Sequence, residues 1–353
     1  MQKQFKSGLK KLFMNKLSEI ISSDAVKICK AVDLSELCGK TILLSGASGL
    51  LGINFLACLK NLATLSHSDI RVFAIIQSEF PAYVNDFLDY KTVTLLRGDL
   101  TNNTFCESLP NADYIIHAAG YGQPGRFMAD PVKTLQLNTS STFALLKKLN
   151  VNGKFLFIST SELYSGLPHP PYNESQIGTT NTTHPRSCYI EGKRCGEAIC
   201  NAFRQNGVAA KSARLALAYG PGTRPDDKRV LNAFIEKAFK GKITLMDQGN
   251  AKRTYCYVSD AVEILWNILL KGTEPLYNVG GFSHTTISEL AEKIGTYLNI
   301  PVEYPDKEQD LVGAPDDVYL DMNKVKQEFR KTDWVNFDEG LQRTINWQKE
   351  LYK

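Results

Sequence analysis

Three glycines that follow a short apolar run constrain the fold of this chain more than any other feature. The run spans residues 41–45, the glycines follow at 46, 49 and 52, and an apolar segment with helical spacing begins at Leu51. A strand that turns through glycines into a helix is typical of a dinucleotide phosphate site, because glycine lets a pyrophosphate approach closely and the helix N-terminus presents unpaired amides. A tight turn that binds no ligand is the alternative. The residues of the turn assigned to cofactor binding are Gly46, Ser48, Gly49, Leu50, Leu51 and Gly52.

Strand-like and helical patterns alternate along the first two thirds of the chain. Helices are expected at 51–62, 131–149 and 186–206, and six apolar runs indicate strands: Thr41–Ser45, Arg71–Ile76, Val93–Leu96, Tyr114–His117, Phe155–Ser159 and Lys211–Leu215. This alternation favours an α/β fold, a Rossmann-like doubly wound parallel sheet with a smaller C-terminal substrate-binding α/β region. We therefore divide the chain into three parts: an N-terminal extension (1–38), a cofactor-binding Rossmann domain with the catalytic residues (39–220), and a mainly substrate-binding region interleaved with that domain (221–353).

Composition excludes several classes of protein. The net charge is only +4 and no basic run is interleaved with aromatics, so nucleic acid is not expected as a partner. Eight cysteines without CxxC pairs favour free thiols and a cytoplasmic location, and five scattered histidines predict no metal site. No apolar run approaches the ~20 residues of a membrane span, so no integral membrane segment is expected. The extension 1–38 has apolar residues at helical spacing among lysines, which predicts an amphipathic helix packed on the domain or on a second subunit, or else lying on a membrane surface.

A hydroxyl, a phenol and an ammonium occupy positions suited to proton transfer. Thr160 follows an apolar strand, and Tyr189 and Lys193 are one helical turn apart on one face of a helix. A tyrosine must ionise to accept a proton from a hydroxyl, yet its ordinary pKa is about 10. A neighbouring ammonium favours the phenolate. With the glycine turn, these residues predict hydride and proton transfer between a nicotinamide and a substrate hydroxyl.

The combined motifs resemble the extended short-chain dehydrogenase/reductases that act on nucleotide sugars, the NAD-dependent epimerase/dehydratase family. The stretches that carry the resemblance include Ser45–Gly52, Gly98–Leu100, His117–Ala119, Asn138–Thr139, Ile158–Tyr164, Tyr189–Lys193, Arg214–Pro221 and Arg253–Asp260. The resemblance implies NAD as cofactor, a nucleoside-diphosphate sugar as substrate, a homodimer, and oxidation at the sugar C4 to a 4-keto intermediate. Thr160, Tyr189 and Lys193 match the catalytic triad of the family. Arg253 matches its diphosphate-binding arginine, and Ser161 and Arg229 are assigned to the same substrate site.

Further cofactor contacts are expected where the later strands end. Gln77 stands after the second strand, where a carboxylate usually holds the ribose, and the lack of an arginine there favours NAD over NADP. We interpret His117 as a packed strand residue rather than as a base. The other residues assigned to the cofactor, with His117, are Asp99, Leu100, Ala118, Ala119, Asn138, Tyr189 and Lys193.

The motifs leave the reaction open within this family. The runs around Thr160 and Tyr189 look most like the UDP-glucuronate decarboxylases, which carry an arginine where this chain has Gly313. Without that guanidinium, a sugar carboxylate lacks its partner. A 4,6-dehydratase needs an acid where Ser161 stands, whereas Glu162, which we add to the catalytic residues, can act as a base. Epimerisation needs the fewest absent residues and is favoured. A UDP-glucuronate decarboxylase, a 4,6-dehydratase and a non-catalytic NAD-binding protein are the alternatives.

Overall fold

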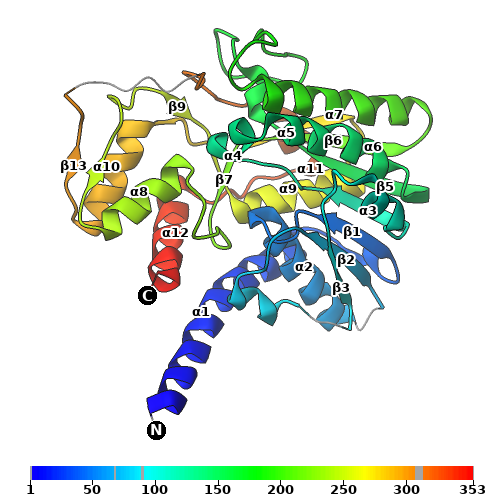
Figure 1. The fold of residues 1–353 in the computed structure, drawn as a ribbon, viewed down its shortest axis with the longest axis horizontal. Helices are drawn as coiled ribbons and strands as arrows, with labels where there is room; N and C mark the ends of the chain where they lie inside the picture. Colours follow the sequence, from blue (N-terminus) through cyan, green and yellow to red (C-terminus); the bar gives the residue numbers. More distant parts are fainter. Residues whose placement is uncertain (1, 67–68, 89–90, 307–312, 353) are drawn as a thin grey trace.

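A parallel sheet forms the centre of the molecule (Figure 1). The computed structural model describes residues 2–66, 69–88, 91–306 and 313–352, and within them the sheet has seven strands in the order β11-β6-β5-β4-β1-β2-β3. The bounds of the strands are β1 Thr41–Ser45, β2 Arg71–Ile76, β3 Val93–Arg97, β4 Ala112–His117, β5 Leu149–Thr160, β6 Ala209–Leu215 and β11 Leu276–Val279. The strand order reverses between β1 and β4, which is the position where open α/β sheets bind ligands. The predicted Rossmann-like doubly wound fold is confirmed.

The strand residues and their register explain where a site can form. Every residue of β1 is buried, as expected for a strand covered on both faces. Ser45 stands opposite His117 of β4, and Thr160 stands opposite Leu215 of β6. Because the carboxyl ends of parallel strands share one edge, the glycine turn after β1 and Thr160 at the end of β5 lie at the same edge of the sheet.

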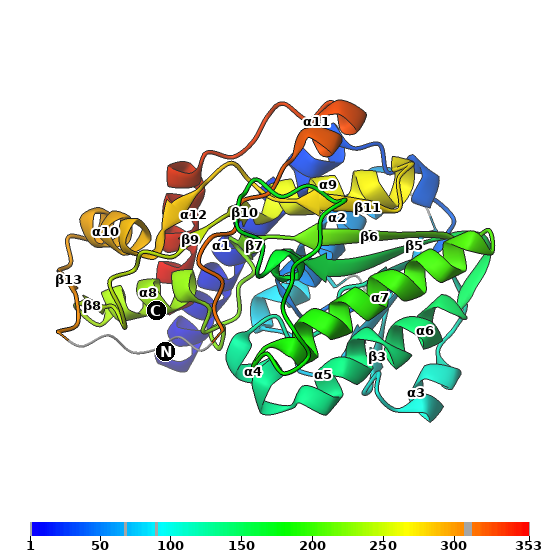
Figure 2. The same cartoon turned by 90° about the horizontal axis from the view of Figure 1, so that it is seen from above.

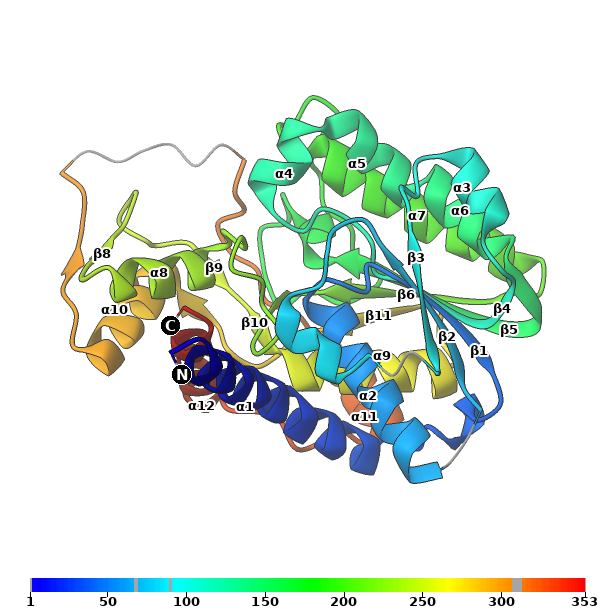
Figure 3. The same ribbon diagram turned by 60° about the horizontal axis from the view of Figure 1, so that its bottom comes forward.

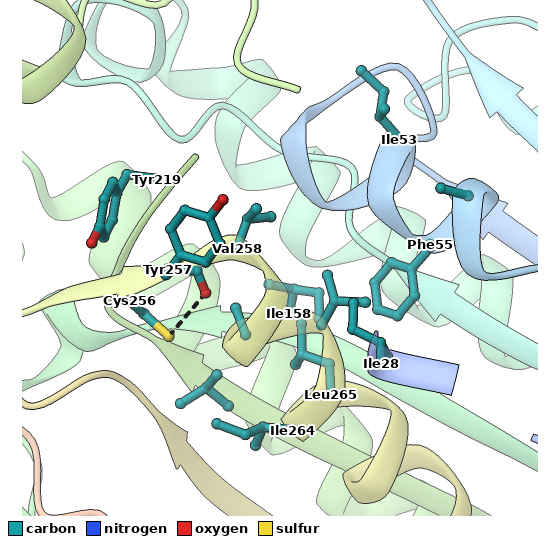
Figure 4. Close-up of a cluster of buried hydrophobic side chains, with 14 of the residues drawn as sticks. Ile28, Ile53, Phe55, Ile158, Tyr219, Cys256, Tyr257, Val258, Ile264 and Leu265 are labelled. Carbon is teal, nitrogen blue, oxygen red and sulfur yellow. Dashed lines mark hydrogen bonds between the residues drawn. The ribbon is translucent and has the colours of Figure 1, made fainter. Parts of the chain in front are cut away.

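Helices cover both faces of the sheet (Figure 2). One layer contains α1 (Gln2–Ala31), α2 (Leu50–Ser66) and α9 (Val258–Lys271), and the other contains α3 (Asn103–Ser108), α5 (Pro131–Asn138), α6 (Ser140–Leu146) and α7 (Ser187–Gln205). Alternate strand residues supply the two cores: Ile42 and Leu44 belong to the first, Leu43 to the second. Figure 4 shows Ile28 of α1, Phe55 of α2 and Leu265 of α9 in the first core near Ile158 of β5.

The single helix expected over 131–149 is wrong. α5 ends at Asn138, α6 begins at Ser140, and Thr139 between them has φ −112° and ψ −82°. The side chains of Asn138, Thr139, Ser140 and Thr142 each donate to the carbonyl four residues earlier. This back-bonding competes with the helical backbone and bends helices.

The N-terminal extension contributes a helix to the packed body. Figure 3 shows α1 beside α12 (Phe337–Leu351), and α1 is buried at Leu17, Ile21 and Ile28. Asp24 of α1 has no exposed surface, accepts a hydrogen bond from the Tyr257 hydroxyl (3.0 Å) and pairs with an arginine of α12. The side chains of 2–15, which carry the first part of the expected amphipathic pattern, lie outside the described part.

The region after residue 220 is smaller and made of short elements (Figure 1). Three two-stranded sheets pair β7 with β10, β8 with β13 and β9 with β12, while β11 joins the central sheet beside β6 in the described residues. The short elements of this region are α8 Val230–Phe239, β8 Ile243–Thr244, β9 Lys252–Arg253, β10 Tyr255–Tyr257, β12 Thr285–Thr286, α10 Ile287–Leu298, β13 Val302–Glu303 and α11 Asn323–Phe329. β7 (Leu217–Tyr219) directly precedes the region, and α4 (Pro124–Ala129) lies earlier in the chain. Across the described ranges, no helix combines the length and the apolar character that crossing a membrane requires.

Candidate active site

A cavity opens at the carboxyl edge of the sheet, between the glycine turn, the end of β5, α7 and the segment 215–229. It brings together most of the predicted site residues, namely Gly46, Gly49, Leu50, Leu51, Gly52, Ala118, Thr160, Ser161, Glu162, Tyr189, Lys193 and Arg229. Its lining also includes polar residues that sequence reasoning missed: Tyr121, Gln123, Arg126, Arg224, Asp226 and Asp227. Most of these lie in loops without a recognisable motif, so no local signal marked them.

The glycine turn fits the dinucleotide that the sequence predicts. Gly46 has φ +69°, and a Cβ there would stand 2.6 Å from the Ala118 carbonyl. At Gly52 a Cβ would stand 2.4 Å from the Gly46 oxygen, so the start of α2 packs against the turn at a distance that only glycine allows. A Cβ at Gly49 would meet only that same oxygen, at 3.3 Å, so this residue leaves the floor of the cavity clear in front of the α2 N-terminus.

The three predicted catalytic side chains meet on one wall of the cavity. The Lys193 ammonium donates to the Ile158 carbonyl of β5 (Nζ···O 2.6 Å) and lies 5.9 Å from the centre of the Tyr189 ring. That ring stacks on Phe127 of α4, with centroids 4.5 Å apart and planes 3° from parallel. The Thr160 hydroxyl hydrogen-bonds to the phenol. Helix α7 and the end of β5 therefore hold the phenol, the ammonium and the hydroxyl together.

Burial dominates the ionisation of this group. It raises the pKa of Tyr189 to about 12, the Glu162 charge adds to the increase, and the hydrogen bond from Thr160 opposes it. Burial lowers the pKa of Lys193 to about 7, against the attraction of Glu197. In the free protein at neutral pH the phenol therefore keeps its proton. A positive charge brought beside it would favour the phenolate.

Beneath the triad lies a buried ion pair that no sequence motif indicated. Arg214 of β6 donates to Glu197 of α7 through Nε (3.0 Å) and Nη2 (2.8 Å), and the Ser159 hydroxyl donates to the same carboxylate (2.5 Å). The Arg214 and Glu197 side chains are only 4% and 8% exposed. The network joins α7 and β5, which carry the catalytic side chains, to β6.

Glu162 lies in a positively charged part of the cavity. Its Oε1 accepts from Arg186 Nη1 at 2.9 Å, while its buried Oε2 has no hydrogen-bond partner among the described residues. Burial raises the pKa of Glu162, and Arg186, Arg253 and His184 act in the opposite direction. The His184 ring fills the space beside Gly313, where a Cβ would stand 2.8 Å from its Cε1. The sequence stretch around Arg186 was noted, but its pairing with Glu162 was missed.

The two arginines assigned to the substrate differ in their surroundings. Arg229 lines the cavity and forms a short ion pair with Asp227 (Nη2···Oδ2 2.6 Å). Arg253 of β9 stands outside the cavity lining, partly buried, and donates from Nη1 to the Lys252 carbonyl (2.7 Å). Both keep donors available for an anionic ligand, and their substrate role stays a prediction.

Several residues assigned to the cofactor do not line the cavity. Gln77 donates to Asp99 (Nε2···Oδ2 3.2 Å), and the same carboxylate pairs with Lys133 at 2.6 Å. Leu100 is buried in the second core. Asn138 is also buried, with its Oδ1 unpaired among the described residues. Of the remaining three, Ser48 belongs to the turn, Ala119 to the segment after β4 and His117 to β4 itself.

The His117 side chain is packed beneath the site, as the sequence interpretation expected. It has no exposed surface, and burial lowers its pKa to about 3, so the ring is neutral. The Leu137 carbonyl can only accept, so Nε2–H is the donor to it (3.0 Å), and Nδ1 of the neutral ring accepts from the Ser45 hydroxyl (2.8 Å). The Ser45 Oγ also accepts from Ala119 N–H at 3.2 Å. With both ring nitrogens occupied, only the backbone of His117 remains for a cofactor contact.

Comparison with known proteins finds a matching family model and similar sequences. The model of the NAD dependent epimerase/dehydratase family matches residues 42–280. UDP-glucuronic acid decarboxylase 1 of Danio rerio is 29% identical over 337 residues, which cover 94% of this chain and 78% of the relative. UDP-glucuronic acid decarboxylase 6 of Arabidopsis thaliana is 34% identical over 254 residues, 70% of this chain and 71% of the relative.

Solved structures show the same fold. The dTDP-glucose 4,6-dehydratase of Streptomyces venezuelae superposes with a TM-score of 0.76 at 22% identity, over 88% of this chain and 97% of that chain. The UDP-glucose 4-epimerase of Thermotoga maritima gives a TM-score of 0.74 at 23% identity, over 89% and 100%. The agreement covers the central sheet and the C-terminal region together.

Proposed function

This chain belongs to the NAD dependent epimerase/dehydratase family, and on that premise we propose that it decarboxylates a UDP-linked uronic acid through a 4-keto intermediate. The prediction of an NAD-dependent enzyme that modifies a nucleotide sugar is confirmed by the family match and by the decarboxylase relatives. The choice of decarboxylation among the reactions of the family is the proposal.

The positive surroundings of Glu162 carry this proposal. Arg186 pairs with that carboxylate at 2.9 Å, and the charge of Arg253 also acts on it, next to Tyr189 and therefore next to the reacting carbon. A uronic acid brings a second carboxylate to this place, which the Arg186 guanidinium attracts, whereas a neutral sugar brings none. The curated relatives act on such a sugar according to their names.

The chemistry of the substrate follows from oxidation at C4. The resulting ketone is β to the C6 carboxylate, so the C5–C6 bond breaks, carbon dioxide leaves and the electron pair moves into the C4 carbonyl to form an enol. C5 then takes up a proton, and the ketone is reduced again. The glycine turn at Gly46, Gly49 and Gly52 would hold NAD, which would supply the acceptor for the C4 hydride and the donor for its return.

The residues of this chain supply the proton transfers. Tyr189 accepts the C4 hydroxyl proton, Thr160 holds that hydroxyl, and Lys193 stabilises the phenolate. Burial raises the pKa of Glu162, so its unpaired Oε2 is suited to carry the proton that C5 needs while Arg186 holds Oε1. Each step thus has a residue in the cavity to perform it.

Epimerisation at C4 is the second candidate, and the sequence favours it because Gly313 replaces an arginine. The structure adds that the His184 ring occupies the space at Gly313. Epimerisation would need only Thr160, Tyr189 and Lys193. Guanidinium groups from segments other than the one around Gly313 lie near Glu162, however. For this reason we rank decarboxylation before epimerisation.

The test is to incubate the protein with UDP-glucuronate and, separately, with UDP-glucose, and to identify each product by mass spectrometry and proton NMR. Loss of one carbon dioxide from UDP-glucuronate is the expected result. An isomer of unchanged mass from either sugar would replace the proposal with the epimerase. Glu162→Gln should slow the loss of carbon dioxide or release the 4-keto sugar, because C5 protonation loses its donor.

We also propose a homodimer formed through the face of α5, α6 and α7. Val132 and Leu135 of α5 and Phe143 of α6 are exposed there, at 66%, 38% and 45%. Burying such neighbouring apolar side chains against a second copy would stabilise the assembly. Light scattering of the protein and of Val132→Asp tests this, with a monomeric variant as the expected result. The cytoplasmic location stays a prediction.

A further inference from the structure

The outer end of the cofactor groove lacks the acidic residue that usually selects NAD. A carboxylate after the second strand normally accepts hydrogen bonds from the adenosine ribose, and it repels a phosphate on the 2′ oxygen. Gln77 stands at that place, and its amide donates to Asp99 at 3.2 Å. The next residue, Ser78, offers a hydroxyl instead of a charge.

A guanidinium from a distant segment reaches this place. Arg224 lines the cavity, and its Nη1 donates to the Ser78 hydroxyl (3.2 Å) and to the Glu79 carbonyl (3.0 Å). The Ser78 hydroxyl also lies 3.5 Å from that of Ser48 in the glycine turn. Arg224 therefore connects the segment over the groove to the end of β2, beside the phosphate-binding turn.

The carboxylates around Arg224 already have other partners. Its Nε donates to Asp226 at 3.2 Å, and that carboxylate also accepts from Arg126 Nη2 at 2.5 Å. Glu79 is bound through both oxygens by Arg97 (Nη2···Oε2 2.6 Å). Among the described residues the contacts of Arg224 use Nε and Nη1, which leaves the two N–H groups of Nη2 for a ligand.

We propose that Arg224 recognises the 2′ position of the adenosine ribose and that the groove accepts NADP as well as NAD. A guanidinium donates to a ribose hydroxyl, and it binds a phosphate more strongly, because both partners are charged and two N–H groups can meet two oxygens. The hydroxyls of Ser78 and Ser48 supply further donors to the same phosphate. The family match identifies NAD as a cofactor. The side chains around the expected position of the adenosine ribose indicate that NADP can bind as well.

Cofactor capture tests the proposal without any turnover. The purified protein is equilibrated with excess NAD⁺ and NADP⁺ in equal amounts, freed of unbound nucleotide and denatured, and the released cofactors are quantified by chromatography. We expect NADP within about tenfold of NAD, since the loss or gain of one charged hydrogen bond changes affinity by about that factor. Arg224→Gln should lower the NADP share about tenfold while it changes NAD capture little.

Two further variants make the result specific. Arg126→Gln is the matched control, because it removes a guanidinium from the same carboxylate, Asp226, without touching Ser78, and it should leave the NADP share unchanged. Ser78→Glu introduces the missing carboxylate and should exclude NADP while it retains NAD.

NADP capture more than about a hundredfold below NAD in the unmodified protein would overturn the proposal. So would an equal loss of both cofactors in Arg224→Gln, since Arg224 would then act only on the groove as a whole. Because the readout is binding, a failure of the proposed decarboxylation leaves it unaffected.

Discussion

Two parts of the site contain arginine–carboxylate pairs that differ in burial. We call the catalytic triad with the buried network beneath it the floor, and Arg126, Arg224 and Asp226 at the cavity the rim. On the floor, Arg214 and Glu197 meet at 2.8 Å with side chains 4% and 8% exposed. On the rim, Arg126 and Asp226 meet at 2.5 Å with 49% and 47% exposed. Water screens the charges of the rim pair but hardly those of the buried floor pair. The two pairs therefore differ in electrostatic interaction energy although their distances are similar. We therefore expect substitutions in the floor to change stability and chemistry, and substitutions in the rim to change mainly ligand binding.

Removing the phenol on the floor should give the largest effect of all. Tyr189→Phe deletes only the hydroxyl that accepts the substrate proton, so turnover should fall by about 10²–10⁴ while the stacked ring and the fold remain. Mass spectrometry of the product measures the loss of turnover. Thermal unfolding of the variant and of the unmodified protein shows whether the fold remains. Full activity in a folded variant would exclude Tyr189 as the proton acceptor.

Breaking the floor ion pair should strongly destabilise the protein. Glu197→Gln leaves the buried Arg214 charge without its partner, which costs about 3–5 kcal/mol of unfolding free energy. Urea unfolding of the variant measures it. The double variant Glu197→Leu with Arg214→Met removes both charges and should recover much of the loss. If Glu197→Gln loses less than about 1 kcal/mol of unfolding free energy, the buried floor pair stabilises the protein no more than an exposed pair does, and the proposed difference between floor and rim is wrong.

The sequence indicated the local parts of this floor but not its long-range pairs. The glycine turn, the strands and the spacing of Tyr189 and Lys193 follow from periodicity and from residues one helical turn apart, which is information contained in neighbouring positions. The contacts between Glu197 and Arg214 and between Glu162 and Arg186 join different elements, and each charge alone looks like an ordinary surface residue. Only the packed fold brings them together.

The same limit applies to the rim and to the N-terminal extension. Arg224 lies 146 residues from Ser78 in the sequence. The residues near the end of the second strand therefore give no sign of this arginine. Asp24 reads as one position on the polar face of an amphipathic helix, yet it is fully buried against Tyr257 and Arg343. Periodicity predicts that a helix forms, whereas the choice of its buried face depends on partners from the far end of the chain.

The buried ammonium on the floor should reduce the stability of the free protein. Burial lowers the pKa of Lys193 to about 7, so between that pH and its ordinary value near 10.5 the unfolded chain binds a proton that the folded protein has released. Stability should therefore rise with pH across this window, and the full penalty should be present below about pH 7. Lys193→Met removes the penalty and should stabilise the cofactor-free protein at pH 7 by on the order of 3 kcal/mol, while it abolishes turnover.

Unfolding in urea at about pH 7 and about pH 9 checks this sign. The advantage of Lys193→Met over the unmodified protein should shrink at the higher pH, because Lys193 is neutral there in the folded state. The other titrating groups are shared by the two proteins, so their contributions to the pH dependence of stability cancel when the proteins are compared at each pH. An advantage that grows with pH, or a variant less stable at pH 7, would mean that the ammonium is well accommodated.

The rim pair should give the smallest effect, and it decides whether the contrast with the floor is real. Arg126→Gln breaks an ion pair whose two side chains are about half exposed, so the expected loss is at most about 1 kcal/mol, smaller still at high salt. Asp226 keeps the Arg224 Nε contact at 3.2 Å, so no carboxylate is left without a partner. Urea unfolding at low and high salt measures the change. A loss near that of Glu197→Gln would show that the rim supports the floor, and ligand selection and stability could then not be changed independently in this protein.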